Sequence, residues 1–240
     1  MAYTNSPLVS STKLSPNHSG QRTHSIDRIT PHCVVGQCSV ETLGNVFLPT
    51  SRQASSNYGI GVDGRVGMYV EETNRSWCSS SAANDQRAVT IECASDATEP
   101  YAFKDVVYQR LIELCTDICK RNGKTKLLWL GDKDKTLSYT PAPDEMVLTV
   151  HRWFADKSCP GNWMYARMGD LAEKVTAALG NQTQAPLDNA PAAWSKDAVN
   201  WALENRLLLG DANGDLKLQE NLTREQFCVM LKRYHDLFQK

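Results

Sequence analysis

Short apolar runs alternate with amphipathic stretches along most of the chain, and this alternation predicts strands and helices in turn. Apolar residues recur at helical spacing between Phe103 and Arg121, and Asn122-Gly123 is a pair that ends helices. Asp63-Gly64 between two short apolar runs predicts a hairpin. The predicted elements are strands over 29–35, 88–92 and 147–151, a hairpin over 57–70, and helices over 39–47, 103–121 and 163–179. This pattern favours an α/β fold in which a mixed central β-sheet is flanked by helices.

The stretches outside this alternation divide the chain into segments of different character. The N-terminal residues are polar and without periodicity, which predicts an extended arm, and residues 124–143 form a polar insertion. A stretch rich in Asn, Gln and Pro predicts a linker, after which the pattern becomes helical again. The predicted divisions are an arm over 1–28, a domain over 29–180, a linker over 181–192 and a small all-helical module over 193–240.

Composition and charge narrow the classes of function. The 240 residues carry a formal net charge of −1, so bulk charge indicates neither nucleic acid nor an anionic membrane as a partner. No apolar stretch reaches the ~18 residues of a membrane span, and no basic segment followed by an apolar core marks a signal peptide. We therefore expect synthesis in a reducing cytoplasm, where the eight cysteines stay free thiols. Cys115 and Cys119, four positions apart on a predicted helix, are expected to be core residues, and so is Cys33.

Two histidines stand at the ends of predicted strands and suggest a metal site. An isolated histidine in an apolar run is usually a core residue, but His32 and His151 are the two of five histidines in strand contexts. The loop after His151 contains Cys159-Pro160-Gly161 and can bring the cysteine thiolate back toward the imidazoles. Two histidines and one cysteine form a three-ligand set with room for water, which is the pattern of a catalytic zinc site.

Two further residues are candidates for a functional site because of their sequence context. Glu92 interrupts a strand that is otherwise apolar, and a buried carboxylate is costly unless it is paired or used. Trp77 lies in a polar stretch and is either part of a substrate-binding rim or a core residue.

These motifs, in this order, resemble the zinc-dependent N-acetylmuramoyl-L-alanine amidases of type 2, whose fold is shared by peptidoglycan-recognition proteins. The matching pieces are Thr30-Pro31-His32, the stretch from Ser55 to Val66, Ala88-Val89-Thr90-Ile91-Glu92, and His151 followed by Lys157-Ser158-Cys159-Pro160. The resemblance implies Zn²⁺ as cofactor and bacterial peptidoglycan as substrate.

The resemblance also implies roles for individual residues. Glu92 is expected to act as general base and proton shuttle, and Lys157 to stabilise the developing oxyanion. Many relatives carry a catalytic tyrosine at the position of Ser56, so we give no chemical role to Tyr58 and favour the glutamate-dependent mechanism. The residues expected to bind substrate are Trp77, Asn57 and Arg152.

The C-terminal segment is similar to one S-layer-homology repeat. Ser195 is expected to cap its first helix, with Trp194 as part of a hydrophobic staple, and Thr223 and Gln226 form a capping box for the second. Such repeats usually act in groups on cell-wall polymers. A single copy leaves wall binding, packing on the first domain and self-association open.

The sequence thus predicts a peptidoglycan hydrolase that cleaves the amide between N-acetylmuramic acid and L-alanine. We expect a phage or prophage endolysin, made in the cytoplasm of the bacterial host and acting on the wall after release at lysis, with a host autolysin as second choice. Two rivals remain open. One is a non-catalytic peptidoglycan-binding protein, against which Cys159 argues, and the other is a cysteine peptidase that uses Cys159 and His151 on the stem peptide.

Overall fold

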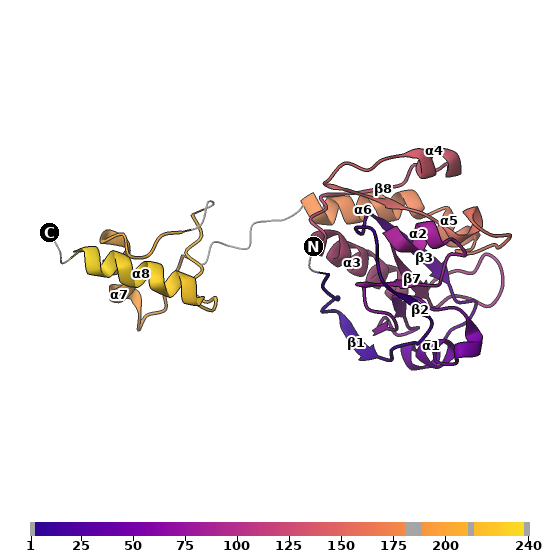
Figure 1. Cartoon of the computed structure of the whole chain (residues 1–240), viewed down its shortest axis with the longest axis horizontal. Coiled ribbons are helices and arrows are strands. Elements are labelled where there is room, and N and C mark those ends of the chain that lie inside the picture. Colours follow the sequence, from indigo (N-terminus) through magenta and orange to yellow (C-terminus); the bar gives the residue numbers. More distant parts are fainter. Residues whose placement is uncertain (1–2, 181–188, 211–213, 238–240) are drawn as a thin grey trace. The chain divides into compact units, whose positions relative to one another are not determined.

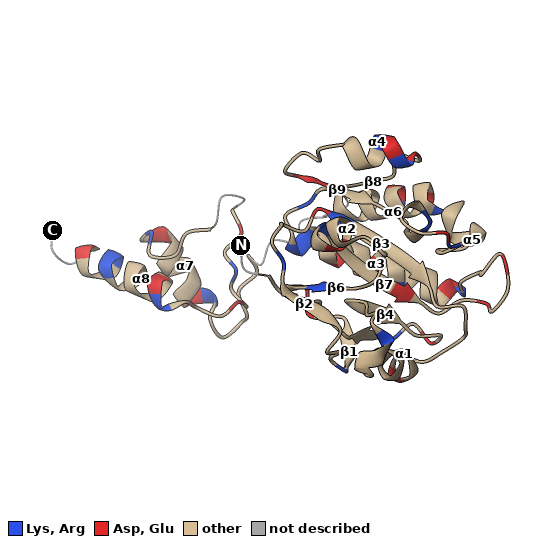
Figure 2. Cartoon of the chain, turned by 45° about the vertical axis from the view of Figure 1, so that its right-hand side comes forward, with Lys and Arg blue, Asp and Glu red and all other residues tan. Residues whose placement is uncertain are grey.

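The computed structural model describes residues 3–180, 189–210 and 214–237, and it divides into two compact units, Met1–Asn181 and Gln182–Lys240. Figure 1 labels the helices and strands of both units. Acidic and basic residues are interspersed along the ribbon of both units (Figure 2), in keeping with the net charge of −1. No helix among the described residues is long and apolar enough to cross a membrane.

The first unit is built on a mixed sheet, as the sequence predicts. Seven strands of the described chain lie in the order β1-β5-β4-β7-β3-β9-β8. The hairpin pair β4 and β5 is antiparallel, and the other neighbours are parallel. The strands are β1 Val9–Thr12, β3 Arg28–Cys33, β4 Tyr58–Ile60, β5 Val66–Met68, β7 Ala88–Cys93, β8 Lys126–Leu128 and β9 Glu145–Leu148. The central strands β3 and β7 are almost entirely buried, which explains their continuous apolar runs.

Helices cover this sheet and supply the rest of the core. In α3 the apolar positions Val107, Leu111, Leu114 and Ile118 are fully buried, which is the face that the helical periodicity predicts. The helix ends at Arg121, and Gly123 follows two residues later with a φ of +66°, the left-handed conformation that glycine adopts readily. The helices of this unit are α1 Val40–Phe47, α2 Ala82–Arg87, α3 Asp105–Arg121, α4 Lys133–Ser138, α5 Asn162–Tyr165 and α6 Met168–Gly180, with 3₁₀ turns η1 Thr50–Arg52 and η2 His151–Trp153.

The N-terminal segment is extended, but it belongs to the sheets and is not a separate arm. Strand β1 pairs with β5 at one edge of the main sheet, and β2 (His18–Gln21) pairs with β6 (Asn74–Ser76). The buried guanidinium of Arg22 donates to the backbone carbonyls of Glu72 and Asp85. Because β1 and β2 alternate between half-buried and exposed residues and carry few apolar side chains, the sequence pattern alone does not predict them.

Three other boundaries differ from the prediction. The polar insertion contains the edge strand β8 and the short helix α4, and the helix expected over 163–179 is divided into α5 and α6. The strand expected to end at His151 ends at Leu148, and the chain then enters η2, where the amide of Phe154 donates to the carbonyl of His151. A short apolar run does not show where ladder hydrogen bonds stop, so such ends are set by tertiary pairing.

The second unit contains α7 (Lys196–Glu204) and α8 (Arg224–Leu237). The capping box of α8 is confirmed, since the amide of Thr223 donates to Gln226 and the amide of Gln226 donates to Thr223 Oγ1. The predicted side-chain cap of α7 is wrong, because Ser195 Oγ donates to the carbonyl of Ala192 and makes no cap hydrogen bond. The predicted staple is wrong as well, because Trp194 is 90% exposed. Several large apolar side chains of this unit are about half exposed, among them Trp201, Phe227, Leu231 and Tyr234.

Candidate metal centre and active site

Three elements deliver the predicted ligands to one end of the central strands. His32 lies near the end of β3, and His151 begins η2 after the neighbouring strand β9. The loop after η2 returns toward His151, because the amide of Arg152 donates to the carbonyl of Cys159 at 3.0 Å. The structure therefore brings together His32, His151 and Cys159. Along the chain, His151 lies 119 residues after His32, and Cys159 lies 127 residues after it.

The spacing of the three ligand atoms suits a tetrahedral metal ion. The candidate ligand atoms of His32, His151 and Cys159 all lie within 4.8 Å of one another. Cys159 Sγ is 3.3 Å from His32 Nδ1, and neighbouring ligand atoms around zinc are roughly 3.3–3.8 Å apart when the bonds are about 2.0–2.3 Å long. His32 Nε2 is buried without a hydrogen-bond partner among the described residues. His151 Nε2 lies 2.9 Å from Ser80 Oγ, and this hydrogen bond leaves Nδ1 as a ligand and orients the ring.

The electrostatics of the two imidazoles favour the form that binds metals. Burial, with a smaller contribution from the charge of His151, holds the pKa of His32 well below its usual range. Burial and the charge of Lys157 likewise lower the pKa of His151. Both rings are therefore neutral at neutral pH, which is the protonation state of a metal ligand.

The thiol of Cys159 needs a cation to become a thiolate. A hydrogen bond with Cys33 and burial raise the pKa of Cys159 well above its usual range. A bound metal ion reverses this effect, because it stabilises the thiolate directly. Cys33 is buried as expected of a core residue, yet it also contacts the ligand thiol, which strand alternation did not predict.

Glu92 lies beside the ligand set, directly across from His32 in the register of β7 and β3. One carboxylate oxygen is 3.7 Å from the thiol sulfur of Cys78, and the other is buried without a partner among the described residues. Burial raises the pKa of Glu92 to about 7. A carboxyl group that titrates near neutral pH can both accept and return a proton, which is what a general acid–base requires.

A surface hollow of about 250 Å³ contains these groups together. Its lining includes the three candidate ligands, Glu92 and the exposed Lys157. A second possible donor set, His32 with Cys78 and Glu92, also lies within 4.8 Å and shares its histidine with the first. Cys78 and Ser80 are not among the predicted site residues, because neither stands in a sequence pattern that indicates a site, and only the fold places them there.

The residues expected to bind substrate lie in three different environments. Trp77 is half-buried, and its indole Nε1 donates to Ser19 Oγ at 2.6 Å. Arg152 contacts the segment that follows Cys159. Its guanidinium donates to Asn162 Oδ1 at 3.2 Å and lies 4.4 Å from the centre of the Tyr165 ring. Asn57 is a correction: it is 0% exposed, and its side chain hydrogen-bonds to the backbone of Val70 and of Thr90 on β7, so substrate cannot reach it.

Ser56 and Tyr58 lie outside the hollow. Ser56 Oγ donates to the backbone carbonyl of Thr90 at 2.9 Å, and the hydroxyl of Tyr58 donates to Glu72 at 2.7 Å. Both side chains are completely buried. Their hydrogen bonds hold the hairpin and the N-terminal segment in place.

A family model for N-acetylmuramoyl-L-alanine amidases matches residues 17–162, and the chain belongs to this enzyme family. The candidate His/His/Cys site agrees with the zinc site of that family. No curated protein matched the chain in a sequence search.

Solved structures align with the chain at low sequence identity. A selenomethionine derivative of AmpD aligns with a TM-score of 0.50 and 16% identity over 72% of this chain and 99% of that chain. The structure of PlyL aligns at 0.48 and 14% identity, over 69% and 95% of the two chains. LysCS, an endolysin and N-acetylmuramoyl-L-alanine amidase from Clostridium intestinale, aligns at 0.44 and 14% identity over 72% and 97%.

Proposed function

We propose that this protein is a zinc-dependent peptidoglycan hydrolase that cleaves the amide between N-acetylmuramic acid and the L-alanine of the stem peptide. The observation that supports this most strongly is the convergence of His32, His151 and Cys159 within 4.8 Å beside Glu92 in one hollow. Two neutral imidazoles and a thiolate suit Zn²⁺, and three protein ligands leave a position open, as catalytic zinc sites require.

The chain's own residues then account for the proton transfers. His32, His151 and Cys159 would hold the zinc ion, which would supply Lewis acidity toward an amide carbonyl and a water molecule. Glu92 takes a proton from that water and returns it to the leaving amine nitrogen, a task that its pKa of about 7 permits at neutral pH. The ammonium group of Lys157, at the rim of the same hollow, stabilises the negative charge that develops on the carbonyl oxygen.

The proposed biological role is wall lysis of the endolysin type, with a host autolysin as alternative. The second unit is proposed to bind a cell-wall polymer or to self-associate, because its large apolar side chains are exposed within that unit. Neither role alters which bond the first unit cleaves.

The cysteine peptidase expected to use Cys159 and His151 remains the second candidate, although the imidazole that hydrogen-bonds to Cys159 Sγ is that of His32, whose Nδ1 is 3.3 Å away. The raised pKa of Cys159 argues against it, since the thiolate is the nucleophile in such enzymes.

The deciding experiment incubates the purified protein with a muramoyl peptide and identifies the products by mass spectrometry. The proposal requires a free carboxyl on the lactyl group and a free L-alanine amine, loss of cleavage with a strong chelator, and recovery with added zinc. Alkylation of cysteine is the contrasting treatment, because it should abolish cleavage by a peptidase that uses Cys159. The exposed Cys228 lies outside the site, so its modification should leave cleavage unchanged. Full activity without metal, or cleavage inside the peptide, would establish the peptidase. Binding without cleavage would establish a recognition protein.

A further inference from the structure

A second group of metal-binding side chains overlaps the first one. The first donor set is His32, His151 and Cys159, and the second donor set is His32, Cys78 and Glu92. In the second set, as in the first, the three candidate ligand atoms all lie within 4.8 Å of one another. An imidazole, a thiolate and a carboxylate are all ligands that zinc accepts, so the second set suits a thiophilic divalent cation.

The distance between Cys78 and Glu92 fits a shared metal ion. Cys78 Sγ and Glu92 Oε1 are 3.7 Å apart, which is long for a hydrogen bond. Around tetrahedral zinc, a sulfur and an oxygen with bond lengths of about 2.3 and 2.0–2.2 Å lie roughly 3.5–3.7 Å apart. One ion can therefore bind both side chains where they already lie.

The remaining atoms of the second donor set also call for a ligand. His32 Nε2 and Glu92 Oε2 are buried and have no hydrogen-bond partner among the described residues. His32 is only 1% exposed, so bulk solvent does not supply the missing partner. Buried polar atoms are almost always paired, and one that finds no partner in the protein indicates a bound ion or an ordered water.

The two donor sets differ in the elements that supply them. His32 and Glu92 are directly opposite each other on the buried central strands β3 and β7. His151 begins the 3₁₀ turn η2, and Cys159 lies in the loop that follows it. A change in that loop can therefore remove two ligands from the first donor set without disturbing the second.

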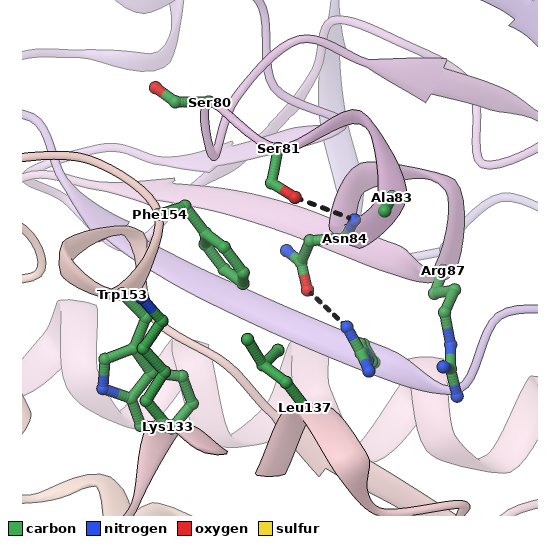
Figure 3. A pocket seen from close by; sticks show the side chains of 10 residues that line it. Ser80, Ser81, Ala83, Asn84, Arg87, Lys133, Leu137, Trp153 and Phe154 are labelled. Atoms are coloured by element: carbon green, nitrogen blue, oxygen red, sulfur yellow. Dashed lines mark hydrogen bonds between the residues drawn. The ribbon is translucent and has the colours of Figure 1, made fainter.

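Cys78 is held in place by the loop between β6 and α2. Its amide donates to Asp85 Oδ2 at 3.0 Å, and the amide of Ser79 donates to the same oxygen at 3.2 Å. Asp85 is only 2% exposed. At the other end of the loop, Ser81 Oγ accepts a hydrogen bond from the amide of Asn84 in α2 (Figure 3). The loop thus presents the Cys78 thiol to Glu92 from a fixed backbone.

We propose that the second donor set is a non-catalytic position for a thiophilic divalent cation, and that it retains the ion when the first donor set loses its two loop ligands. A neutral imidazole has one free lone pair, so His32 binds one ion at a time. Binding in the second position releases the thiol proton of Cys78 to solvent and occupies the carboxylate of Glu92. The inference rests on the proposed function only for the consequence that an ion placed there blocks the general base.

The test uses Co²⁺, which shows a thiolate-to-metal charge-transfer absorption when a cysteine binds it. The double variant His151→Ala/Cys159→Ala removes the two loop ligands and is expected to bind about one Co²⁺ per chain with this absorption. Adding Cys78→Ala should abolish the absorption and weaken binding by more than the about 10- to 100-fold that loss of an outer-shell partner costs. Adding Glu92→Gln should weaken binding and keep the absorption.

Cys33→Ala is the matched control, because Cys33 is a buried thiol that contacts Cys159. Added to the double variant, it should leave the absorption unchanged. Thermal unfolding shows whether each variant is folded. If the double variant is not, Cys159→Ala alone carries the test, with and without Cys78→Ala, because the first donor set then contains no thiolate.

The proposal is overturned if the folded variant binds no Co²⁺, if the absorption persists without Cys78, or if Cys33→Ala abolishes it. Cleavage of a muramoyl peptide by the natural protein is measured separately. Cleavage by the natural protein together with no Co²⁺ in the variant refutes only the second position. Cys78-dependent binding together with no cleavage by the zinc-loaded natural protein supports the second position and refutes the hydrolase.

Discussion

Replacement of Glu92 by glutamine tests the chemistry and the electrostatics of the site together. The change keeps the shape of the side chain and removes its charge. General acid–base catalysis typically contributes about 10²–10⁴ in rate, so muramoyl–alanine cleavage should fall by that order. Zinc content should stay the same, because Glu92 is proposed as a base and is not a ligand in the first donor set. Loss of zinc would instead favour the overlapping donor set with Cys78.

The same substitution should stabilise the metal-free protein at alkaline pH. Burial raises the pKa of Glu92 from 4.5 to about 7, so the folded state holds its proton more tightly than the unfolded state does. Stability is then lost as the pH rises from about 4.5 to about 7, and the full cost remains above that range. Each pKa unit corresponds to about 1.4 kcal/mol, so the shift gives an upper bound of about 3.5 kcal/mol, and partial exposure of the side chain reduces it to about 1–3 kcal/mol.

The assay is denaturant unfolding of both proteins after removal of metal, at about pH 4 and about pH 8. The variant and the natural protein should be nearly equal at the lower pH, and the variant should be more stable at the higher pH. Glu113→Gln is a suitable control, because this carboxylate is exposed on α3. A stability difference that does not change with pH would refute the buried, neutral-range carboxyl, and near-normal turnover would remove Glu92 from the mechanism.

Three further predictions address the metal, the division of the chain and the N-terminal segment. His32→Ala should lose the bound zinc, about one ion per chain, while His235→Ala on α8 should keep it, as measured by metal analysis. Residues 1–180 should fold alone and cleave a soluble muropeptide, and a truncated protein that binds zinc without cleaving would contradict the proposed division of labour. Arg22→Ala should lower the unfolding free energy by about 2–4 kcal/mol, because it leaves buried acceptors unpaired. Arg110→Ala should change it by at most about 0.5 kcal/mol. Equal effects of the two substitutions in chemical denaturation would argue against a stabilising role of the Arg22 hydrogen bonds.

Features that depend on residues close together in the chain could be predicted from the sequence. The helical repeat of α3, the Asp63-Gly64 hairpin and the Thr223–Gln226 capping box each involve neighbours within a few positions. The ligand candidates could also be predicted, because histidines at the ends of apolar runs and a Cys-Pro-Gly loop are recognisable without coordinates. These patterns were sufficient for the fold class and for the metal-site hypothesis.

Tertiary structure alone decided which distant residues become partners. Asn57 stands next to a recognised motif, yet hydrogen bonds with Arg22, Val70 and Thr90, three residues far apart in the chain, enclose its side chain. Arg28 and Arg87 are both candidates for Asp27, and only the packing of α2 against β3 gives that carboxylate to Arg87 and leaves Arg28 facing a cavity. Which side chain pairs with a given carboxylate depends on contacts between residues that are dozens of positions apart in the chain. The periodicity of one segment contains no information about such contacts.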